Sequence, residues 1–252
     1  MSDSDFSCCV GEYDSYRPHY PDALFDYLEQ RFVLQPSSMV IDAGAGTGRV
    51  TDPLAQRGYH VIATDISTEM LARVGPIEAA HMGQVDRILA CAESLAVLDG
   101  LADLWVSGHA FHWFEPNTTL QEAARILKPG GGLAFFWNNR DSAKTPMEGE
   151  VKELVIRANP NYKGHRDKNW LDILKRSKDF TDIERAHFPH TVEMTADTYA
   201  GLWQSSSHIR GALDAVGLAS FDRELRRLIS RYHKDEKFPI YYIVDTYSGR
   251  RV

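Results

Sequence analysis

A short apolar run ends in three closely spaced glycines in Val40-Ile41-Asp42-Ala43-Gly44-Ala45-Gly46-Thr47-Gly48. Glycines at such a position permit positive φ angles and let a ligand approach the backbone closely where a strand turns into a helix. Helical spacing over residues 49–57, stopped by Gly58, supplies the helix that follows. This segment therefore predicts the opening strand, turn and helix of a parallel α/β sheet.

Strand-like and helix-like segments alternate on either side of this unit. A leading helix is predicted over residues 21–32, with Pro21 in its first turn. Four further strands are predicted as short apolar runs, at residues 60–64, 87–91, 103–107 and 133–137. A helix over 118–127 ends at Lys128-Pro129-Gly130, where proline forbids continuation and glycine permits a tight reversal into the fifth strand. The alternation indicates a Rossmann-like, open and mainly parallel sheet.

The C-terminal part of the chain follows a looser pattern. Two β-rich segments, 183–194 and 238–247, are expected to pair as an antiparallel edge and to complete a seven-stranded sheet. Roughly forty residues separate them. Because apolar residues between them recur at helical spacing, we expect a helical cap inserted near the C-terminus; these residues are Phe221, Leu225, Leu228 and Tyr232.

Composition excludes several classes of protein. The 252 residues are 43% apolar and carry a net charge of −7 with both signs dispersed, which argues against a nucleic-acid or anionic-membrane surface. No apolar stretch is long enough to cross a bilayer, and the N-terminus lacks a basic start followed by an apolar run. The three cysteines, Cys8, Cys9 and Cys91, form neither a disulfide framework nor a zinc pattern. We expect a cytoplasmic protein without membrane or nucleic-acid partners.

The glycine spacing and its acidic neighbour indicate the ligand. The spacing is Gly-x-Gly-x-Gly, whereas a dinucleotide-binding turn has Gly-x-Gly-x-x-Gly, and Asp42 lies two positions before Gly44. A carboxylate here would repel a pyrophosphate but would favour an ammonium and a sulfonium centre, directly or through water. S-adenosylmethionine carries these two cations and no phosphate. Stabilisation by NAD and not by S-adenosylmethionine would instead favour a nicotinamide enzyme.

A second carboxylate follows the second predicted strand. Asp65 lies 21 residues after Gly44, at the tip of the neighbouring parallel strand. There it can accept hydrogen bonds from both ribose hydroxyls of a nucleoside. The alternative is that Asp65 caps the helix that starts near Thr68, and both roles are compatible.

Four segments carry a resemblance to a known family: 40–51 (VIDAGAGTGRVT), 61–67 (VIATDIS), 91–95 (CAESL) and 124–138 (ARILKPGGGLAFFWN). In order and spacing, the sequence resembles class I S-adenosylmethionine-dependent methyltransferases over about residues 13–140. Residues 13–21 and 110–114 resemble the branch that includes trans-aconitate and related small-molecule methyltransferases. The resemblance implies a single methyltransferase domain over 1–252, with a cofactor-binding core at 13–140 and the remaining strands and a helical substrate cap at 141–252.

The resemblance also implies the residues that bind the cofactor. Gly44 and Gly46 would face the methionine portion, Asp42 is expected to bind the cofactor beside them, and Asp65 would bind the ribose. The remaining contacts are expected from Ile66 beside the adenine, from Ala92 and Glu93 at its edge, and from the end of the fourth strand at Ser107, Gly108 and His109. Tyr16 and Arg17 lie in a segment that folds over the cofactor in this family, and Arg17 is expected to pair with its carboxylate. Pro53, inside the helix after the glycine turn, departs from the pattern and leaves the start of that helix open.

Methyl transfer from a sulfonium is an in-line displacement, which requires alignment and exclusion of water more than a catalytic group. A carboxylate acceptor is already ionised at neutral pH, whereas a phenol or an amine would gain from a general base. His112, just past the fourth strand, is the candidate for that base. The alternative is that His112 packs in an aromatic wall or binds a backbone carbonyl. No pair of histidines has metal-site spacing, so we expect no metal.

Aromatic and histidine side chains are candidates for the wall of an acceptor pocket: His19, Trp113, Trp137 and Trp203, with Tyr199 and His208 near them. The alternative is that the aromatic side chains fill the core. The expected function is methyl transfer to a small-molecule acceptor, at oxygen, by a monomer or homodimer. A tRNA or protein methyltransferase and a non-catalytic S-adenosylmethionine-binding module remain open alternatives.

Overall fold

The computed structural model describes residues 16–75, 83–162 and 168–252. The described chain forms two compact units, which we treat separately. We call them the sheet unit, residues 19–75, 83–138, 168–188 and 244–252, and the helical unit, residues 16–18, 139–162 and 189–243. No helix among the described residues is long and apolar enough to cross a membrane.

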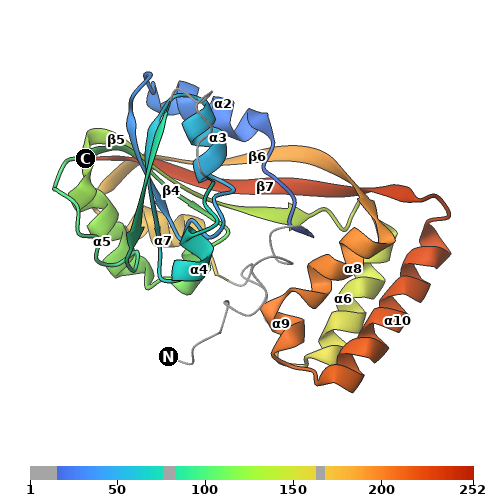
Figure 1. The fold of residues 1–252 in the computed structure, drawn as a ribbon. Helices are drawn as coiled ribbons and strands as arrows, with labels where there is room; N and C mark the ends of the chain where they lie inside the picture. Colours follow the sequence, from blue (N-terminus) through green and yellow to red (C-terminus); the bar gives the residue numbers. More distant parts are fainter. Residues whose placement is uncertain (1–15, 76–82, 163–167) are drawn as a thin grey trace. The chain divides into compact units, whose positions relative to one another are not determined.

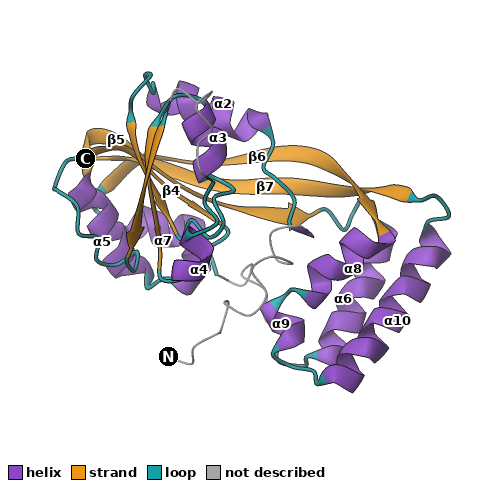
Figure 2. Cartoon of the chain, viewed as in Figure 1, coloured by secondary structure: helices purple, strands orange, loops and turns teal. Residues whose placement is uncertain are grey.

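Seven strands form one sheet in the order β3-β2-β1-β4-β5-β7-β6. Strands are drawn as arrows in Figure 1 and coloured orange in Figure 2. Their bounds are β1 Met39–Ala43, β2 His60–Asp65, β3 Gln84–Leu89, β4 Ala102–Gly108, β5 Leu127–Arg140, β6 Phe180–Thr195 and β7 Lys237–Arg251. Strands β3, β2, β1, β4 and β5 are parallel, with Asp42 of β1 beside Ala63 of β2 and Val106 of β4. The prediction of an open, mainly parallel seven-stranded sheet with antiparallel pairing at one edge is confirmed.

Alternating side chains of the strands fill the two faces of the sheet in the sheet unit, as period-two strands require. On one face, Val40 and Leu104 pack against helices α2 (Asp22–Phe32) and α3 (Thr51–Gln56). On the other face, Ile41 and Trp105 pack with residues of α5 (Pro116–Ile126) and α7 (Trp170–Arg176). A short helix, α4 (Thr68–Leu71), follows β2. Because both faces are covered, the strand ends are left to carry the polar side chains.

The observed starts of β5 and α3 differ from the predicted ones. Strand β5 begins at Leu127 and not at 133, and its pairing with β4 shifts register between Ala102 and Leu104. Lys128-Pro129-Gly130 therefore ends α5 as predicted, but it forms an irregularity inside a strand and not a turn before one, with Gly130 at φ +76°. Helix α3 starts only at Thr51, which places Pro53 in its first turn, where a missing N–H costs no hydrogen bond.

The helical unit contains α6 (Pro146–Ala158), α8 (Ala196–Gln204), α9 (Ser207–Arg210) and α10 (Ala215–Tyr232). The prediction of helices between the last two strands is confirmed by α8, α9 and α10. In α10 the buried stripe is Phe221, Leu225 and Ile229, while Tyr232 lies on the exposed side. Helix α6, which precedes β6, was not predicted and supplies Met147 and Val151 to the same core.

Candidate active site

The glycine turn after β1 adopts the backbone conformation that its sequence predicts. Gly44, Gly46 and Gly48 all have positive φ, at +69°, +57° and +94°. A Cβ atom at Gly44 would lie 2.6 Å from the Cβ of Ala110, so this glycine is required for packing. A Cβ at Gly46 would meet no atom within 4 Å. The backbone at Gly46 therefore faces open space, where a ligand can approach it.

Asp65, at the end of β2, holds the turn from the neighbouring strand. Its Oδ2 accepts a hydrogen bond from the Gly46 N–H at 2.9 Å, and its Oδ1 accepts one from the Ser67 N–H at 3.0 Å. The cap of α4 is Ser67, whose hydroxyl accepts from the Met70 N–H at 3.2 Å. Asp65 thus supports the capping residue but does not cap the helix itself. Each of its oxygens has a second lone pair for a ligand hydroxyl.

Asp42 lies beneath the turn and is fully buried. Its Oδ2 accepts from the Thr51 hydroxyl at 2.6 Å, and its Oδ1 has no hydrogen-bond partner among the described residues. Burial raises the pKa of Asp42 to about 7, against the effect of the Thr51 hydrogen bond and aided by the negative charge of Asp65. A buried carboxyl with one unpartnered oxygen indicates an incomplete site. The structure places Asp42 behind the glycine turn.

The residues expected around the adenine lie beside these strand ends. Ile66 is 71% exposed, although it is large and apolar. Ala92 is buried, and Glu93 accepts a hydrogen bond through Oε1 from the Glu115 N–H at 2.9 Å. An exposed isoleucine next to the carboxylate of Asp65 is a surface that the face of a base would cover.

The end of β4 brings three more predicted residues to the same edge of the sheet. Ser107 is fully buried, and its hydroxyl has no hydrogen-bond partner among the described residues. A Cβ at Gly108 would lie 2.6 Å from the Cγ2 of Val50, so only glycine fits there. His109 has a positive φ of +56°, and its N–H donates to the Phe136 carbonyl at 2.7 Å.

His112 lies in a short 3-10 helix, η2 (Phe111–Trp113), directly after this edge. The indole Nε1–H of Trp137 donates to Nδ1 of His112 at 3.0 Å. A nitrogen that accepts a hydrogen bond carries no proton, so the neutral imidazole has its proton on Nε2. In this tautomer Nε2 carries the proton and Nδ1 accepts from Trp137, so neither ring nitrogen is ready to take up a proton. The predicted role as a general base therefore requires that the bond to Trp137 break.

The structure separates the predicted pocket residues of the sheet unit. Trp137 is 1% exposed and stacks on Trp170 with ring centroids 5.0 Å apart, so its ring belongs to the core. Trp113 is 53% exposed beside His112. His19 is exposed, and its carbonyl accepts a hydrogen bond from the Asn138 side chain at 3.4 Å. Of these three residues, Trp113 has the geometry of a surface that a ligand could cover.

The other predicted residues lie in the helical unit. The Tyr16 ring packs against Gly201 so closely that a Cβ there would lie 2.5 Å from the Tyr16 Cε2. Arg17 lies near His208, whose pKa is lowered by burial and by the Arg17 charge. Trp203 is buried and lies under the Arg140 guanidinium, 4.0 Å from its carbon. The roles of Tyr16 and Arg17 at the cofactor and of Trp203 at the acceptor stay predictions.

Arg140, whose side chain is 22% exposed, belongs to a polar cluster with the buried Glu148 and Tyr199 that the sequence does not reveal. Its Nε lies 3.0 Å from Oε2 of Glu148, whose Oε1 accepts a hydrogen bond from the Tyr199 hydroxyl at 2.6 Å. Burial raises the pKa of Tyr199, although the charge of Arg140 opposes this. The cluster links β5, α6 and α8 inside the apolar core of the helical unit.

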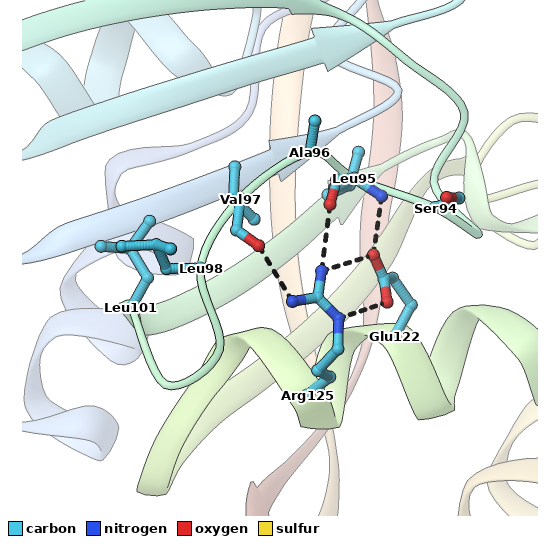
Figure 3. A pocket seen from close by; sticks show the side chains of 8 residues that line it. All are labelled: Ser94, Leu95, Ala96, Val97, Leu98, Leu101, Glu122 and Arg125. Atoms are coloured by element: carbon cyan, nitrogen blue, oxygen red, sulfur yellow. Dashed lines mark hydrogen bonds and ion pairs between the residues drawn. The ribbon is translucent and has the colours of Figure 1, made fainter.

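A hollow of about 650 Å³ lies apart from the glycine turn, between the loop after β3 and α5 (Figure 3). It is lined by residues 94–98, Leu101, Glu122 and Arg125.

No group of three or more His, Cys, Asp or Glu side chains among the described residues is arranged to hold a metal ion.

Comparisons with known proteins identify the family of this chain and proteins of similar fold. Residues 41–135 match the family model described as a methyltransferase domain. An uncharacterised methyltransferase of Mycobacterium tuberculosis is 31% identical over 227 residues, which cover 90% of this chain and 86% of the relative. A ubiquinone biosynthesis O-methyltransferase of Xylella fastidiosa is 31% identical over 161 residues, which cover 60% of this chain and 63% of that protein. A solved structure from Anaeromyxobacter dehalogenans, provisionally named a type II methyltransferase, has a TM-score of 0.71 at 21% identity, covering 93% of this chain and 98% of that one.

Proposed function

This chain belongs to the methyltransferase family, and from that premise we propose that it binds S-adenosylmethionine at the glycine turn and methylates a small-molecule acceptor at oxygen. The observation that carries the proposal is the open space at Gly46 next to the Asp65 carboxylate. Here an accessible backbone at Gly46 lies beside the two carboxylate oxygens of Asp65, which suits a nucleoside that carries an amino-acid chain and has ribose hydroxyls to donate.

The residues present fit this cofactor. Gly44 and Gly46 provide backbone for the methionine portion, and Asp65 has acceptor capacity for the ribose hydroxyls. Ile66 offers its exposed apolar surface to one face of the adenine, and Ala92 and Glu93 lie in the loop that would meet its edge. When bound, S-adenosylmethionine supplies an electrophilic methyl group on a sulfonium.

Two carboxyl groups set the electrostatics of the turn. The negative charge of Asp65 adds to the effect of burial in raising the pKa of Asp42, and one oxygen of Asp42 has no hydrogen-bond partner among the described residues. A cationic ligand nearby would stabilise the ionised form of Asp42 and lower its pKa. An anionic pyrophosphate would do the reverse. The charge of the site therefore favours a sulfonium nucleoside over a dinucleotide.

His112 is proposed to orient the acceptor by donating a hydrogen bond from Nε2. Because Nδ1 already accepts from Trp137, the imidazole does not serve as the base that removes a proton. The acceptor oxygen then has to be ionised before it reacts, as a carboxylate or an acidic phenol is at neutral pH. In-line displacement onto such an oxygen needs alignment and exclusion of water only.

The acceptor class has two further supports. The ubiquinone biosynthesis relative is named for transfer to oxygen, and the net charge of −7 disfavours a nucleic acid as the acceptor. We propose that Trp113, exposed beside His112, contacts the acceptor in the sheet unit. His19, Trp137 and Trp203 remain predictions as acceptor contacts, as Tyr16 and Arg17 do as cofactor contacts.

Transfer of label tests the proposal directly. Protein incubated with methyl-labelled S-adenosylmethionine and a pool of small organic acids and phenols should yield a labelled product, while the Asp65→Asn variant should yield none. Label found in tRNA or protein instead would contradict the small-molecule assignment. Binding of S-adenosylmethionine without transfer to any pool would indicate a non-catalytic module.

A further inference from the structure

The loop over residues 91–99 follows β3 and carries Ala92 and Glu93, the two residues proposed to meet the adenine edge. Few backbone hydrogen bonds stabilise it from within: the Ser94 N–H donates to the Cys91 carbonyl at 3.2 Å, and the Val97 N–H donates to the Leu95 carbonyl at 2.8 Å. Side chains of another element must therefore fix its conformation. Those side chains come from α5 (Figure 3).

Arg125 on α5 uses all five of its N–H groups on protein acceptors. Nε donates to Glu122 Oε2 at 2.8 Å, and Nη2 donates to Glu122 Oε1 at 2.8 Å and to the Leu95 carbonyl at 3.0 Å. Nη1 donates to the Val97 carbonyl at 2.9 Å and to Asp99. Three of these acceptors belong to the 91–99 loop. Arg125 has no N–H group left to donate to a ligand. We therefore interpret the hollow around it as the place where α5 is bonded to the loop, and not as a binding site.

Glu122, on the same helix, adds a further hydrogen bond to the loop. Its Oε1 accepts a hydrogen bond from the Leu95 N–H at 2.6 Å. The pKa of Glu122 is lowered, mainly by its hydrogen bonds with Arg125, so the carboxylate is ionised at neutral pH. Both backbone groups of Leu95 are thereby held by one Glu122–Arg125 pair, which we call the α5 clamp. The position of the loop backbone at Leu95 and Val97 is thus tied to α5 through main-chain groups, in addition to the contact with the Asp99 side chain.

The other end of the loop is tied to the start of the same helix. Glu93 Oε1 accepts from the N–H of Glu115, the residue that caps α5. The buried face of α5, with Leu120 and Ala123, packs into the core together with Ala92 and Leu95. Helix α5 thus fixes the positions of both residues that are proposed to contact the adenine, Ala92 and Glu93.

We propose that the α5 clamp is a positioning device that sets the affinity of this protein for adenine nucleosides. The inference rests on the proposed function and deepens it. With the clamp intact, Ala92 and Glu93 are held in the binding geometry before the ligand arrives, so little loop ordering opposes binding. Arg125 and Glu122 act through the loop and do not touch the nucleoside.

Calorimetric titration with 5′-methylthioadenosine and with S-adenosylhomocysteine tests this role. In Arg125→Met, the Kd of both ligands should rise by the same factor, about tenfold or more. The factor is the same because the loop is proposed to contact the adenine, which both ligands contain. The kcat at saturating S-adenosylmethionine should remain that of the wild type. Arg185→Met is the matched control, since Arg185 forms a two-bond pair with Asp245 in the same unit, far from this loop in the sequence. Its Kd values should stay within about twofold of the wild type.

Amide hydrogen exchange separates a positioning role from a merely structural one. Arg125→Met should exchange faster in residues 93–99 while its other protected amides stay unchanged. Faster exchange in this loop with an unchanged Kd would overturn the inference, as would a Kd shift shared by the Arg185 control. If Arg125→Met does not fold, Glu122→Gln and Arg125→Lys give the same tests with part of the hydrogen bonds retained. Failure of the wild type to bind either ligand would refute the proposed function itself.

Discussion

Trp137 donates its indole N–H to Nδ1 of His112 at 3.0 Å, and so fixes which nitrogen of the histidine carries the proton. The two residues come from β5 and from the segment after β4, and the indole ring itself is buried in the core. A core side chain thus controls the chemistry of a residue at the edge of the sheet.

Removal of that donor should change turnover and spare cofactor binding. Trp137→Phe releases Nδ1, so both imidazole tautomers become populated and the donor at Nε2 is no longer fixed. We expect kcat to fall by about tenfold with an unchanged Kd for S-adenosylhomocysteine. Trp105→Phe is the matched control, because Trp105 is buried in the same core cluster and its Nε1 has no hydrogen-bond partner among the described residues. An equal loss of kcat in both variants would contradict the role of the Trp137–His112 bond.

Asp65→Asn should abolish most of the cofactor affinity. The substitution removes the charge from two hydrogen bonds to ribose, each of which contributes on the order of 1.5–3 kcal/mol. Equilibrium dialysis should show a Kd raised by about a hundredfold or more. Asp86→Asn, which affects a carboxylate on β3 that pairs with His60 at 2.7 Å, should bind as the wild type does. An unchanged Kd in Asp65→Asn would remove the ribose assignment.

The two glycines of the turn should respond differently to alanine. Gly44→Ala places a Cβ 2.6 Å from the Cβ of Ala110 and should lower the free energy of unfolding by a few kcal/mol, about the cost of overpacking plus a positive φ. Gly46→Ala meets no atom within 4 Å, so it should cost only about 1–2 kcal/mol for its φ of +57°. Its methyl group enters the space assigned to the ligand, so binding should be lost from a folded protein. Tight binding by Gly46→Ala would place the ligand elsewhere.

The buried carboxyl of Asp42 should give a measurable pH dependence of stability. Its pKa is raised from 3.8 to about 7 on folding, mainly by burial, so the folded state holds the proton more tightly than the unfolded state. The stabilisation is complete below pH 3.8 and is lost as the pH rises through 7, by at most about 4 kcal/mol. Asp42→Asn keeps an acceptor for Thr51 and cannot ionise, so its urea-unfolding free energy should decline less between pH 4 and 8. Parallel pH profiles for the two proteins would show that Asp42 does not titrate in this range.

The polar cluster of the helical unit should matter for stability far more than a surface ion pair. Arg140→Met leaves the Glu148 carboxylate buried without its guanidinium, which costs about 3–5 kcal/mol for a buried pair. Arg226→Met breaks exposed pairs with Asp197 and Asp222 and should cost less than about 1 kcal/mol. Urea denaturation of both variants measures the difference. Equal losses would show that the Arg140–Glu148 pair is not buried in solution.

Much of the sheet follows from local sequence. The prediction for β2 is within one residue of the observed strand and that for the turn between β1 and α3 within two, because apolar runs and glycines report local backbone requirements. The start of β5 was predicted wrongly at 133, since Pro129 and Gly130 are tolerated inside a strand wherever the pairing with β4 shifts. Helix α6 was missed because its apolar face is defined by α8 and α10 and not by a cap or a strong local pattern.

Some residues of the candidate site could also be predicted from local sequence, and others could not. Gly46 and Asp65 were predicted because the ends of neighbouring parallel strands meet at one edge of the sheet. The donor to His112 and the α5 clamp were not, since both depend on contacts between elements about 25 residues or more apart that only the packing of the core brings together. No short motif in the sequence carries these bonds.

The central claim is that the acidic glycine turn binds a sulfonium nucleoside. Its most direct test is calorimetric titration of the folded wild-type protein with S-adenosylmethionine, with NAD as the comparison ligand. The account predicts saturable binding of one S-adenosylmethionine per chain and none of NAD. Saturable binding of NAD, or a folded protein that releases no heat with S-adenosylmethionine and retains none in dialysis, would contradict it.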